Sequence, residues 1–289
     1  MSVQIVIDSA CDLPKNTADQ LGLVYVPMRT VFEGVEYLDG IDIEPRQFYE
    51  KLIESDVLPT TSQAPPADFE SAFEAIVRQG DTAVCITVSS ELSGTYQSAM
   101  IAAERFLGKI IVVDSRSVTI GEQLLVLRAV KLRDEGWNAW EMAEILNHEK
   151  QRIRLIALLD TLEYLKKGGR ISSAAAIAGA ILSIKPVLEL VDGKIEIRGK
   201  ARGSKNGNNK LMELVRSSNG INFEKPFMLA YSGLSDQLLQ KYIEDSRELY
   251  EGQTEYLPVC CIGSTIGTHA GPGAIGLAFF ENESIEAAS

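Results

Sequence analysis

One repeated pattern constrains the fold more than any other feature of this sequence: a short aliphatic run ends in polar residues, and a helical pattern follows. In the first half of the chain the runs are Val3–Ile7, Ala83–Val88 and Lys109–Val113. Strands that alternate with helices indicate βαβ units, which form a parallel sheet with helices on both faces. We therefore predict an α/β fold for the first half.

The second half has a different pattern. The segment Pro186–Arg198 predicts a β-hairpin, because the dipeptide Asp192-Gly193 near its centre favours a two-residue turn. Further strands are predicted at Phe227–Tyr231 and Ala274–Phe280, with helices between the strands. This mixture indicates a smaller α+β domain.

The chain length of 289 residues suits two domains, which we place at residues 1–150 and 151–289. The formal net charge of −12 argues against binding to nucleic acid, because the field of the protein repels phosphates. The first residues lack the basic region of a signal peptide. The longest apolar stretch, Ala174–Val191, is interrupted by Lys185-Pro186, so no transmembrane segment is predicted. We expect a cytoplasmic protein.

Hydroxyl groups cluster where one of the predicted strands ends. The segment Ser89–Thr95 contains Ser89, Ser90 and Ser93 and leads into a helix that begins near Gly94. The N-terminus of a helix presents unpaired N–H groups and a partial positive charge, so it attracts phosphates and carboxylates. The cluster predicts an anion site, although any single serine can instead cap the helix.

The Gly-rich segment Gly267–Gly276 holds His269, one of two histidines in the chain. The segment matches G-x-G-x-x-G, but a dinucleotide site needs a helix after this pattern. A strand pattern, Ala274–Phe280, follows instead, so we predict no such site. We expect His269 to contact a ligand and His148 to lie on a solvated helix face.

Sequence patterns of catalytic sites are mostly missing. The chain has no G-x-S-x-G elbow, no Walker phosphate loop and no metal-binding spacing, so we predict no metal and no cofactor. Ser93 and His269 could form a nucleophile–base pair, but no residue is marked as an orienting acid. We predict a binding protein and keep, as the alternative, a hydrolase or kinase that acts on a small phosphorylated or carboxylated metabolite.

Basic residues concentrate in and after the predicted hairpin. Between Lys194 and Lys210 there are six basic residues and one acidic residue. In a chain of negative net charge this favours either a docking face for an acidic partner or a solvated hairpin. The segment Ala174–Ile184 predicts a buried helix, and its small side chains leave room for a guest molecule.

Six segments, taken in order along the chain, carry a resemblance to a known family. They are Ile5–Ser9 with Asp12-Leu13, Thr61–Gln63, Ser89–Thr95, Val113–Ser115, Leu165–Ile171 and His269–Ala274. Together they resemble the DegV family. The resemblance implies a DegV-like fold in which a long-chain fatty acid lies between the α/β domain and the α+β domain. Studied members include the lipid-binding subunit of a bacterial fatty acid kinase.

The resemblance also assigns roles around the carboxylate of the fatty acid. It implies that Thr61 and Ser93 hydrogen-bond the carboxylate and that His269 approaches it. Ser62 and Gly94 are further candidates from the same loops. This chain would have no nucleotide site and would not be an enzyme by itself. It would present the fatty acid to an ATP-dependent kinase subunit, of dihydroxyacetone-kinase-like type, which forms an acyl phosphate for phospholipid metabolism.

Other assignments concern the acyl chain and the partner. By resemblance, Ile177, Ala180 and Ile181 would line the acyl chain, and Arg170 and Arg202 would face the kinase. Transient contact with a membrane stays open. A further alternative is a lipid-responsive signalling module whose ligand changes its docking surface.

Overall fold

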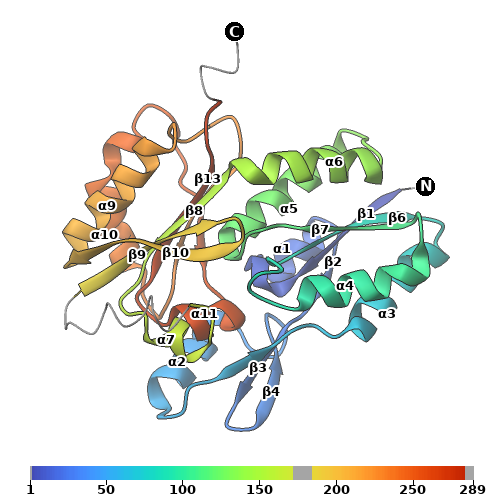
Figure 1. The fold of residues 1–289 in the computed structure, drawn as a ribbon, viewed down its shortest axis with the longest axis horizontal. Coiled ribbons are helices and arrows are strands. Elements are labelled where there is room, and N and C mark those ends of the chain that lie inside the picture. The colour runs from blue at the N-terminus through green and yellow to red at the C-terminus, as the bar shows by residue number, and fades with distance from the viewer. Residues whose placement is uncertain (1, 172–183, 284–289) are drawn as a thin grey trace.

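The computed structural model describes residues 2–171 and 184–283, so Ile177, Ala180 and Ile181 lie outside the described residues. The described residues form three sheets (Figure 1). A parallel sheet and a mixed sheet lie on either side of helix α5 (Thr119–Asp134). A small antiparallel sheet lies below them in this view.

The parallel sheet confirms the α/β prediction. Its strands are β1 (Val3–Asp8), β2 (Leu23–Val26), β6 (Thr82–Thr87) and β7 (Ile110–Asp114), and its helices include α1 (Lys15–Gln20), α3 (Pro66–Arg78), α4 (Thr95–Ala103) and α6 (Ala139–Glu149). The strand order is β2-β1-β6-β7. Alternate residues of β1 serve opposite faces: Ile5 and Ile7 pack with α5 and α6, whereas Val6 packs with α3 and α4. The sheet is thus covered on both faces.

The mixed sheet forms the second half of the molecule. Its strands are β8 (Ile153–Leu158), β9 (Ile184–Val191), β10 (Lys194–Arg202), β11 (Phe227–Tyr231), β12 (Val259–Cys261) and β13 (Ile275–Phe280). Their order is β10-β9-β8-β13-β11-β12, and only β11 and β12 pair in parallel. Helices α9 (Ser204–Ser217) and α10 (Gln237–Asp245) cover one face. The predicted hairpin is confirmed, with Asp192 and Gly193 at its turn.

Helix α5 packs against both large sheets. Leu124 belongs to the core beside the mixed sheet, whereas Leu125 and Val126 belong to the core beside the parallel sheet. A helix in such a position must be apolar on most sides. Helix α5 lies within the predicted first domain, but it contacts strands of both halves. The predicted domain boundary near residue 150 therefore stays a prediction.

The third sheet is absent from the sequence prediction. It contains β3 (Arg29–Phe32), β4 (Val35–Leu38) and β5 (Thr60–Ser62), in the order β4-β3-β5. Strands of three or four residues are too short for their alternation to be recognised. Helices α2 (Pro45–Glu54) and α11 (Ser264–Ala270) lie against each other, and α11 also contacts β3 and β5. Because α11 ends at Ala270, the first part of the Gly-rich segment Gly267–Gly276 is helical.

Buried carboxylates hold the loops at the ends of the parallel strands. Asp8, at the end of β1, accepts hydrogen bonds from the backbone N–H groups of Ala10 and Val88, both at 2.8 Å. Asp114, at the end of β7, accepts from the Ser90 N–H (3.2 Å) and the Ser90 hydroxyl (2.6 Å). These polar ends thus shape the loops that carry the site.

Two further carboxyl groups are buried beside Asp8. Asp12 accepts from the Gly263 N–H (2.9 Å) and the Thr119 hydroxyl (2.5 Å). Glu122, near the start of α5, is fully buried, and neither of its oxygens has a hydrogen-bond partner within the described residues. Burial raises the pKa of Asp8 to about 7 and that of Asp12 to about 8, and it raises the pKa of Glu122 well above its usual range.

Replacement of Glu122 by glutamine should make folding less sensitive to rising pH. A carboxyl group whose pKa rises on folding keeps its proton in the folded state. The free energy of unfolding therefore falls as pH rises from 4.5 towards the folded-state pKa. The slope reaches about 1.4 kcal/mol per pH unit for one proton. Urea unfolding from about pH 5 to 8 should show a shallower fall for Glu122→Gln than for the wild type.

The matched control is Glu144→Gln on the exposed side of α6, which should keep the wild-type slope. Equal slopes for Glu122→Gln and the wild type would contradict a raised pKa at Glu122.

Candidate functional site

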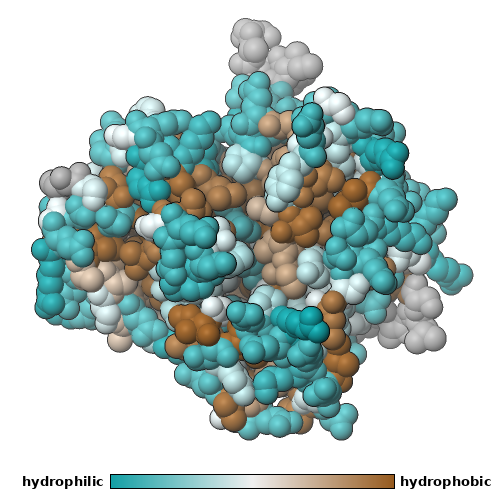
Figure 2. Space-filling view, turned by 180° about the vertical axis from the view of Figure 1, so that it is seen from behind, coloured by the Kyte–Doolittle hydropathy of each residue, from teal (hydrophilic) through white to brown (hydrophobic). Residues whose placement is uncertain are grey.

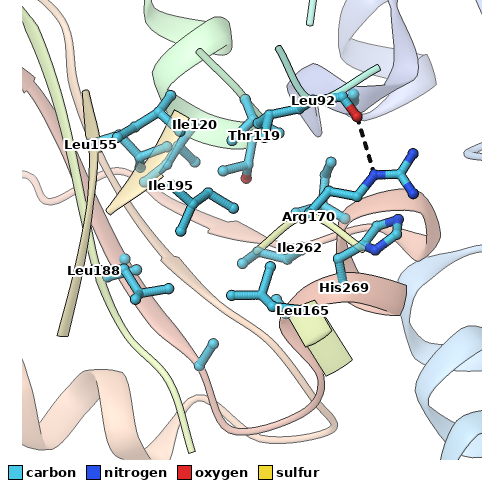
Figure 3. A pocket seen from close by; sticks show the side chains of 18 of the residues that line it. Leu92, Thr119, Ile120, Leu155, Leu165, Arg170, Leu188, Ile195, Ile262 and His269 are labelled. Carbon is cyan, nitrogen blue, oxygen red and sulfur yellow. Dashed lines mark hydrogen bonds between the residues drawn. The ribbon is translucent and has the colours of Figure 1, made fainter. Parts of the chain in front are cut away.

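A cavity lies between the mixed sheet, α5 and the loops of the parallel sheet (Figure 3). Most of its lining is hydrocarbon. Figure 3 shows Ile120, Leu155 and Leu188 towards one side, and Arg170 and His269 towards the other. The cavity therefore has an apolar part and a polar end.

Thr61 and His269 meet at the polar end from two separate elements. Thr61 lies in β5 and His269 near the end of α11, and Oγ1 of Thr61 is 2.8 Å from Nε2 of His269. Burial, with a smaller contribution from Arg170, lowers the pKa of His269 to about 4. The imidazole is therefore neutral near pH 7. A side-chain carbon at Gly168 would overlap the ring, so glycine is required beside it.

Ser93 reaches the cavity from the loop between β6 and α4. Its Oγ is 2.9 Å from Oγ1 of Thr95 and accepts a hydrogen bond from the Thr95 N–H at 3.3 Å. Within the described residues, Ser93 and His269 each hydrogen-bond a threonine and not each other. The nucleophile–base pair that the sequence left open is therefore not formed.

Arg170 also lines the polar end. Its Nε donates to the Leu92 carbonyl (3.1 Å, Figure 3), and its Nη1 donates to the Gly168 carbonyl (2.7 Å). The resemblance gave Arg170 a role in kinase docking. In the structure its half-buried guanidinium lines the cavity, where its positive charge acts on the site.

Small residues on the mixed sheet open the apolar part of the cavity. They come from three adjacent strands or their ends: Ala157, Ala230, Ala274 and Gly276. Across from them, α5 contributes Ile120. A side-chain carbon at Gly276 would lie 3.7 Å from Cδ1 of Ile120, in ordinary contact, so a larger side chain there would enter the cavity. This part of the cavity suits a flexible hydrocarbon chain.

The tip of the β9–β10 hairpin joins the second half of the chain to the loop that carries Ser93. Ser89 Oγ donates to the Gly193 carbonyl (2.9 Å), and Arg116 Nη1 donates to the Asp192 carbonyl (3.3 Å). Glu91 completes the junction with two ion pairs. Its Oε1 lies 3.1 Å from Nη1 of Arg116, and its Oε2 lies 3.3 Å from Nζ of Lys194. Ser89, predicted within the anion-binding cluster, is therefore buried in this junction.

The remaining predicted residues lie elsewhere. Ser62 is exposed and Gly94 precedes α4, and neither is among the residues that line the cavity. A side-chain carbon at Gly94 would overlap Gln63, so this glycine serves loop packing. Arg202 is exposed on β10. The lining residues that sequence reasoning missed include Leu155, whose aliphatic strand pattern is shared with ordinary core positions.

A metal-binding cluster and a membrane-spanning helix are both absent from the described part of the chain. Residues 2–171 and 184–283 contain no group of three or more His, Cys, Asp or Glu side chains that could hold a metal ion. The same residues contain no helix long and apolar enough to cross a membrane.

Hydrophilic residues cover much of the face in Figure 2, with hydrophobic patches near its middle.

The sequence of this chain matches a known protein family. A family model described as "Uncharacterised protein, DegV family" matches residues 2–282. The chain belongs to the DegV family. A DegV domain-containing protein of Deinococcus radiodurans is 35% identical over 96% of this chain and 98% of its own length. One of Caldanaerobacter subterraneus is 34% identical over 97% and 99%, respectively.

Solved DegV structures share the fold. A DegV family protein from Thermus thermophilus, described by its fatty acid binding, superposes with a TM-score of 0.87 at 32% identity and covers 98% of this chain and 100% of its own. The Bacillus subtilis DegV, described as a fatty acid binding protein, gives a TM-score of 0.83 at 29% identity, with coverage of 98% and 100%. The expected DegV-like fold is thus confirmed.

The protonation of His269 can be measured directly. The variant His148→Gln leaves His269 as the sole histidine of the chain, so its ring signals in an NMR titration need no further assignment. In the protein without bound ligand the midpoint should lie at about 4. Arg170→Met should raise this midpoint, because loss of a nearby positive charge favours the imidazolium.

Arg78→Met, which removes an exposed guanidinium from α3, should leave the midpoint unchanged. A midpoint near the ordinary value of 6.5 would contradict the burial of the ring.

Proposed function

We propose that this protein binds a long-chain fatty acid in the cavity between its two halves. The carboxylate lies at Thr61, Ser93 and His269, and the acyl chain extends along the apolar lining. The observation that carries this proposal is a single cavity that joins a small set of polar donors to a long hydrocarbon surface. The fatty-acid-binding DegV proteins of similar structure support it.

The polar end has the chemistry that a buried carboxylate needs. An ionised carboxylate away from water is costly unless hydrogen bonds and charge compensate it. Thr61 and Ser93 supply hydroxyl donors, and neutral His269 supplies a ring N–H once its tautomer suits the ligand. Arg170, in the same lining, supplies a positive charge.

The apolar part supplies most of the affinity. Burial of each CH₂ group contributes about 0.8 kcal/mol to the free energy of binding, so an acyl chain of some 16 carbons contributes more than ten times that amount. Apolar side chains from α5 and the mixed sheet line this part. Selection between chain lengths would follow from the residues that end the cavity.

We further propose that the protein acts in the cytoplasm and presents its fatty acid to a separate kinase subunit, which forms the acyl phosphate. Four free cysteines, of which three are buried, suit a reducing compartment. Ser93 and His269 each hydrogen-bond a threonine and not each other, which supports a binding role. The exposed basic residues of β10, Arg202 among them, would receive an acidic surface of the kinase.

The lipid itself tests the first proposal. Protein purified from its expression host and extracted with organic solvent should release about one fatty acid per chain, identified by mass spectrometry. Thr61→Val and Ser93→Ala should each weaken fatty-acid binding about tenfold, since each removes a hydrogen bond to a charged group.

The matched control is Ser62→Ala, which removes an exposed hydroxyl next to Thr61 and should keep full binding. The proposal fails if the wild type releases no lipid and takes up none from a mixture of fatty acids.

A reconstituted reaction tests the second proposal. With purified kinase, ATP and lipid-loaded protein, Arg202→Glu should lower acyl-phosphate formation at least about fivefold, because it reverses a charge at the docking face. Its lipid content should stay at the wild-type level. Arg78→Glu on α3, which is also exposed, serves as the charge-matched control. Equal rates for the two variants would contradict a role of β10 in docking the kinase.

A further inference from the structure

Ser89 lies in the loop that joins β6 to α4, and each of its polar groups is engaged. Its N–H donates to the Ser117 carbonyl (2.8 Å), and its carbonyl accepts from the N–H groups of Leu92 (3.0 Å) and Ser93 (3.1 Å). Its hydroxyl donates to the Gly193 carbonyl (2.9 Å). Ser89 is fully buried, but it does not line the cavity between the two halves. It therefore belongs to the frame of the loop and not to the binding surface.

The two residues whose N–H groups bind Ser89 both belong to the polar end of the cavity. Ser93 lines the cavity and is one of the hydroxyl donors proposed for the carboxylate. The Leu92 carbonyl accepts a hydrogen bond from Nε of Arg170 at 3.1 Å (Figure 3). A shift of the loop at Ser89 would therefore move a hydroxyl donor and also the acceptor that holds the positive charge.

The hydrogen bond to Gly193 ties this loop to the other half of the molecule. Ser93 follows β6 of the parallel sheet, whereas Arg170 lies beyond β8 of the mixed sheet. A loop lacks the repeated hydrogen bonds of a helix or strand, so its position depends on a few individual contacts. The turn of the β9–β10 hairpin supplies one of these contacts from the second half. The spacing between donors from the two halves thus depends on this contact.

The ion pairs beside this contact fix the junction less firmly. Arg116, Glu91 and Lys194 are all exposed, and exposed ion pairs contribute little because water screens them. Ser89 and Gly193 are both buried. Loss of a buried hydrogen bond leaves its remaining partner away from water, which makes the loss costly. The Ser89–Gly193 hydrogen bond is therefore the main link between the hairpin and the loop.

We propose that Ser89 is a positioning residue, through which the tip of the β9–β10 hairpin sets the places of Ser93 and Arg170 around the carboxylate of a bound fatty acid. The proposal rests on the proposed function and adds to it a residue outside the cavity lining. Gly193 is part of the same arrangement, since a side-chain carbon there would lie 2.4 Å from Oγ of Ser89.

Two variants disturb this arrangement from opposite sides. Ser89→Ala removes the hydroxyl, and Gly193→Ala forces the hairpin tip away from it. Each should weaken binding of cis-parinaric acid, a fluorescent fatty acid, about fivefold, because a displaced Ser93 loses a hydrogen bond to a charged group. In protein that already carries Ser89→Ala, Gly193→Ala should change the affinity less than about twofold, because the contact that it disturbs is already lost.

Matched controls separate positioning from a loss of stability. Ser246→Ala removes a buried hydroxyl that donates to a backbone carbonyl, that of Tyr242 (2.6 Å), and Ser246 does not line the cavity. Gly252→Ala adds a side chain at a φ of +75°, close to the +81° of Gly193, but with nothing within 4 Å. Both controls should bind cis-parinaric acid as the wild type does. Thermal unfolding reports the stability of all four variants.

The Nε–H signal of Arg170 in an NMR spectrum gives a readout that needs no lipid. The signal is assigned by its loss in Arg170→Lys, and its chemical shift reports the hydrogen bond to the Leu92 carbonyl. In protein without bound ligand, Ser89→Ala and Gly193→Ala should shift this signal. The two control variants should leave it in place.

The results for Ser89 and for lipid binding can be told apart. Wild-type protein that binds no fatty acid would contradict the proposed function, and the Arg170 signal still tests whether Ser89 positions the loop. An unchanged signal in both Ser89→Ala and Gly193→Ala would overturn the positioning role, whatever the lipid result. Wild-type affinity in both variants, or equal weakening by the two controls, would overturn it as well.

Discussion

The burial of α5 between two sheets is the constraint on which the rest of the structure depends. A helix in this position must present apolar side chains in almost every direction, and Leu124 and Leu125 do so towards opposite sheets. The two sheets are thereby held a helix diameter apart. Where small residues such as Gly276 face α5, this spacing leaves unfilled volume, and that volume is the cavity between the two halves. The core packing and the candidate site therefore have one origin.

The polar end of the cavity combines neutral donors with a single half-buried cation. Neutral His269 and the hydroxyls of Thr61 and Ser93 can hydrogen-bond an anion without bringing charges of their own into the interior. Arg170 is held in the wall by backbone carbonyls, so its position does not depend on an acidic partner. Thr61, Ser93, His269 and Arg170 thus give this end of the cavity hydrogen-bond donors and one positive charge.

The sequence predicts the parallel sheet and the hairpin because their signals are local: aliphatic runs for β1 and β6, and an Asp-Gly turn for β9 and β10. The resemblance to the DegV family also predicts Thr61, Ser93 and His269, which the structure brings to one cavity. The sequence does not predict the strands β3 to β5, because three or four residues are too few to show an alternation, and β5 also pairs with β3 from a distant part of the chain. The position of Arg170 in the cavity wall was missed because its partner Leu92 is 78 residues away.

The hairpin junction is made largely through main-chain atoms. Ser89 and Arg116 bind carbonyl groups of Gly193 and Asp192, and only a glycine at 193 leaves room for the Ser89 side chain. The contact with the Asp192 carbonyl does not depend on the side chain at residue 192, whereas residue 193 has to be glycine. The strands beyond the turn can therefore change in sequence while the two halves of the protein stay joined. Related proteins could in this way acquire different surface chemistry on β10 around an unchanged cavity.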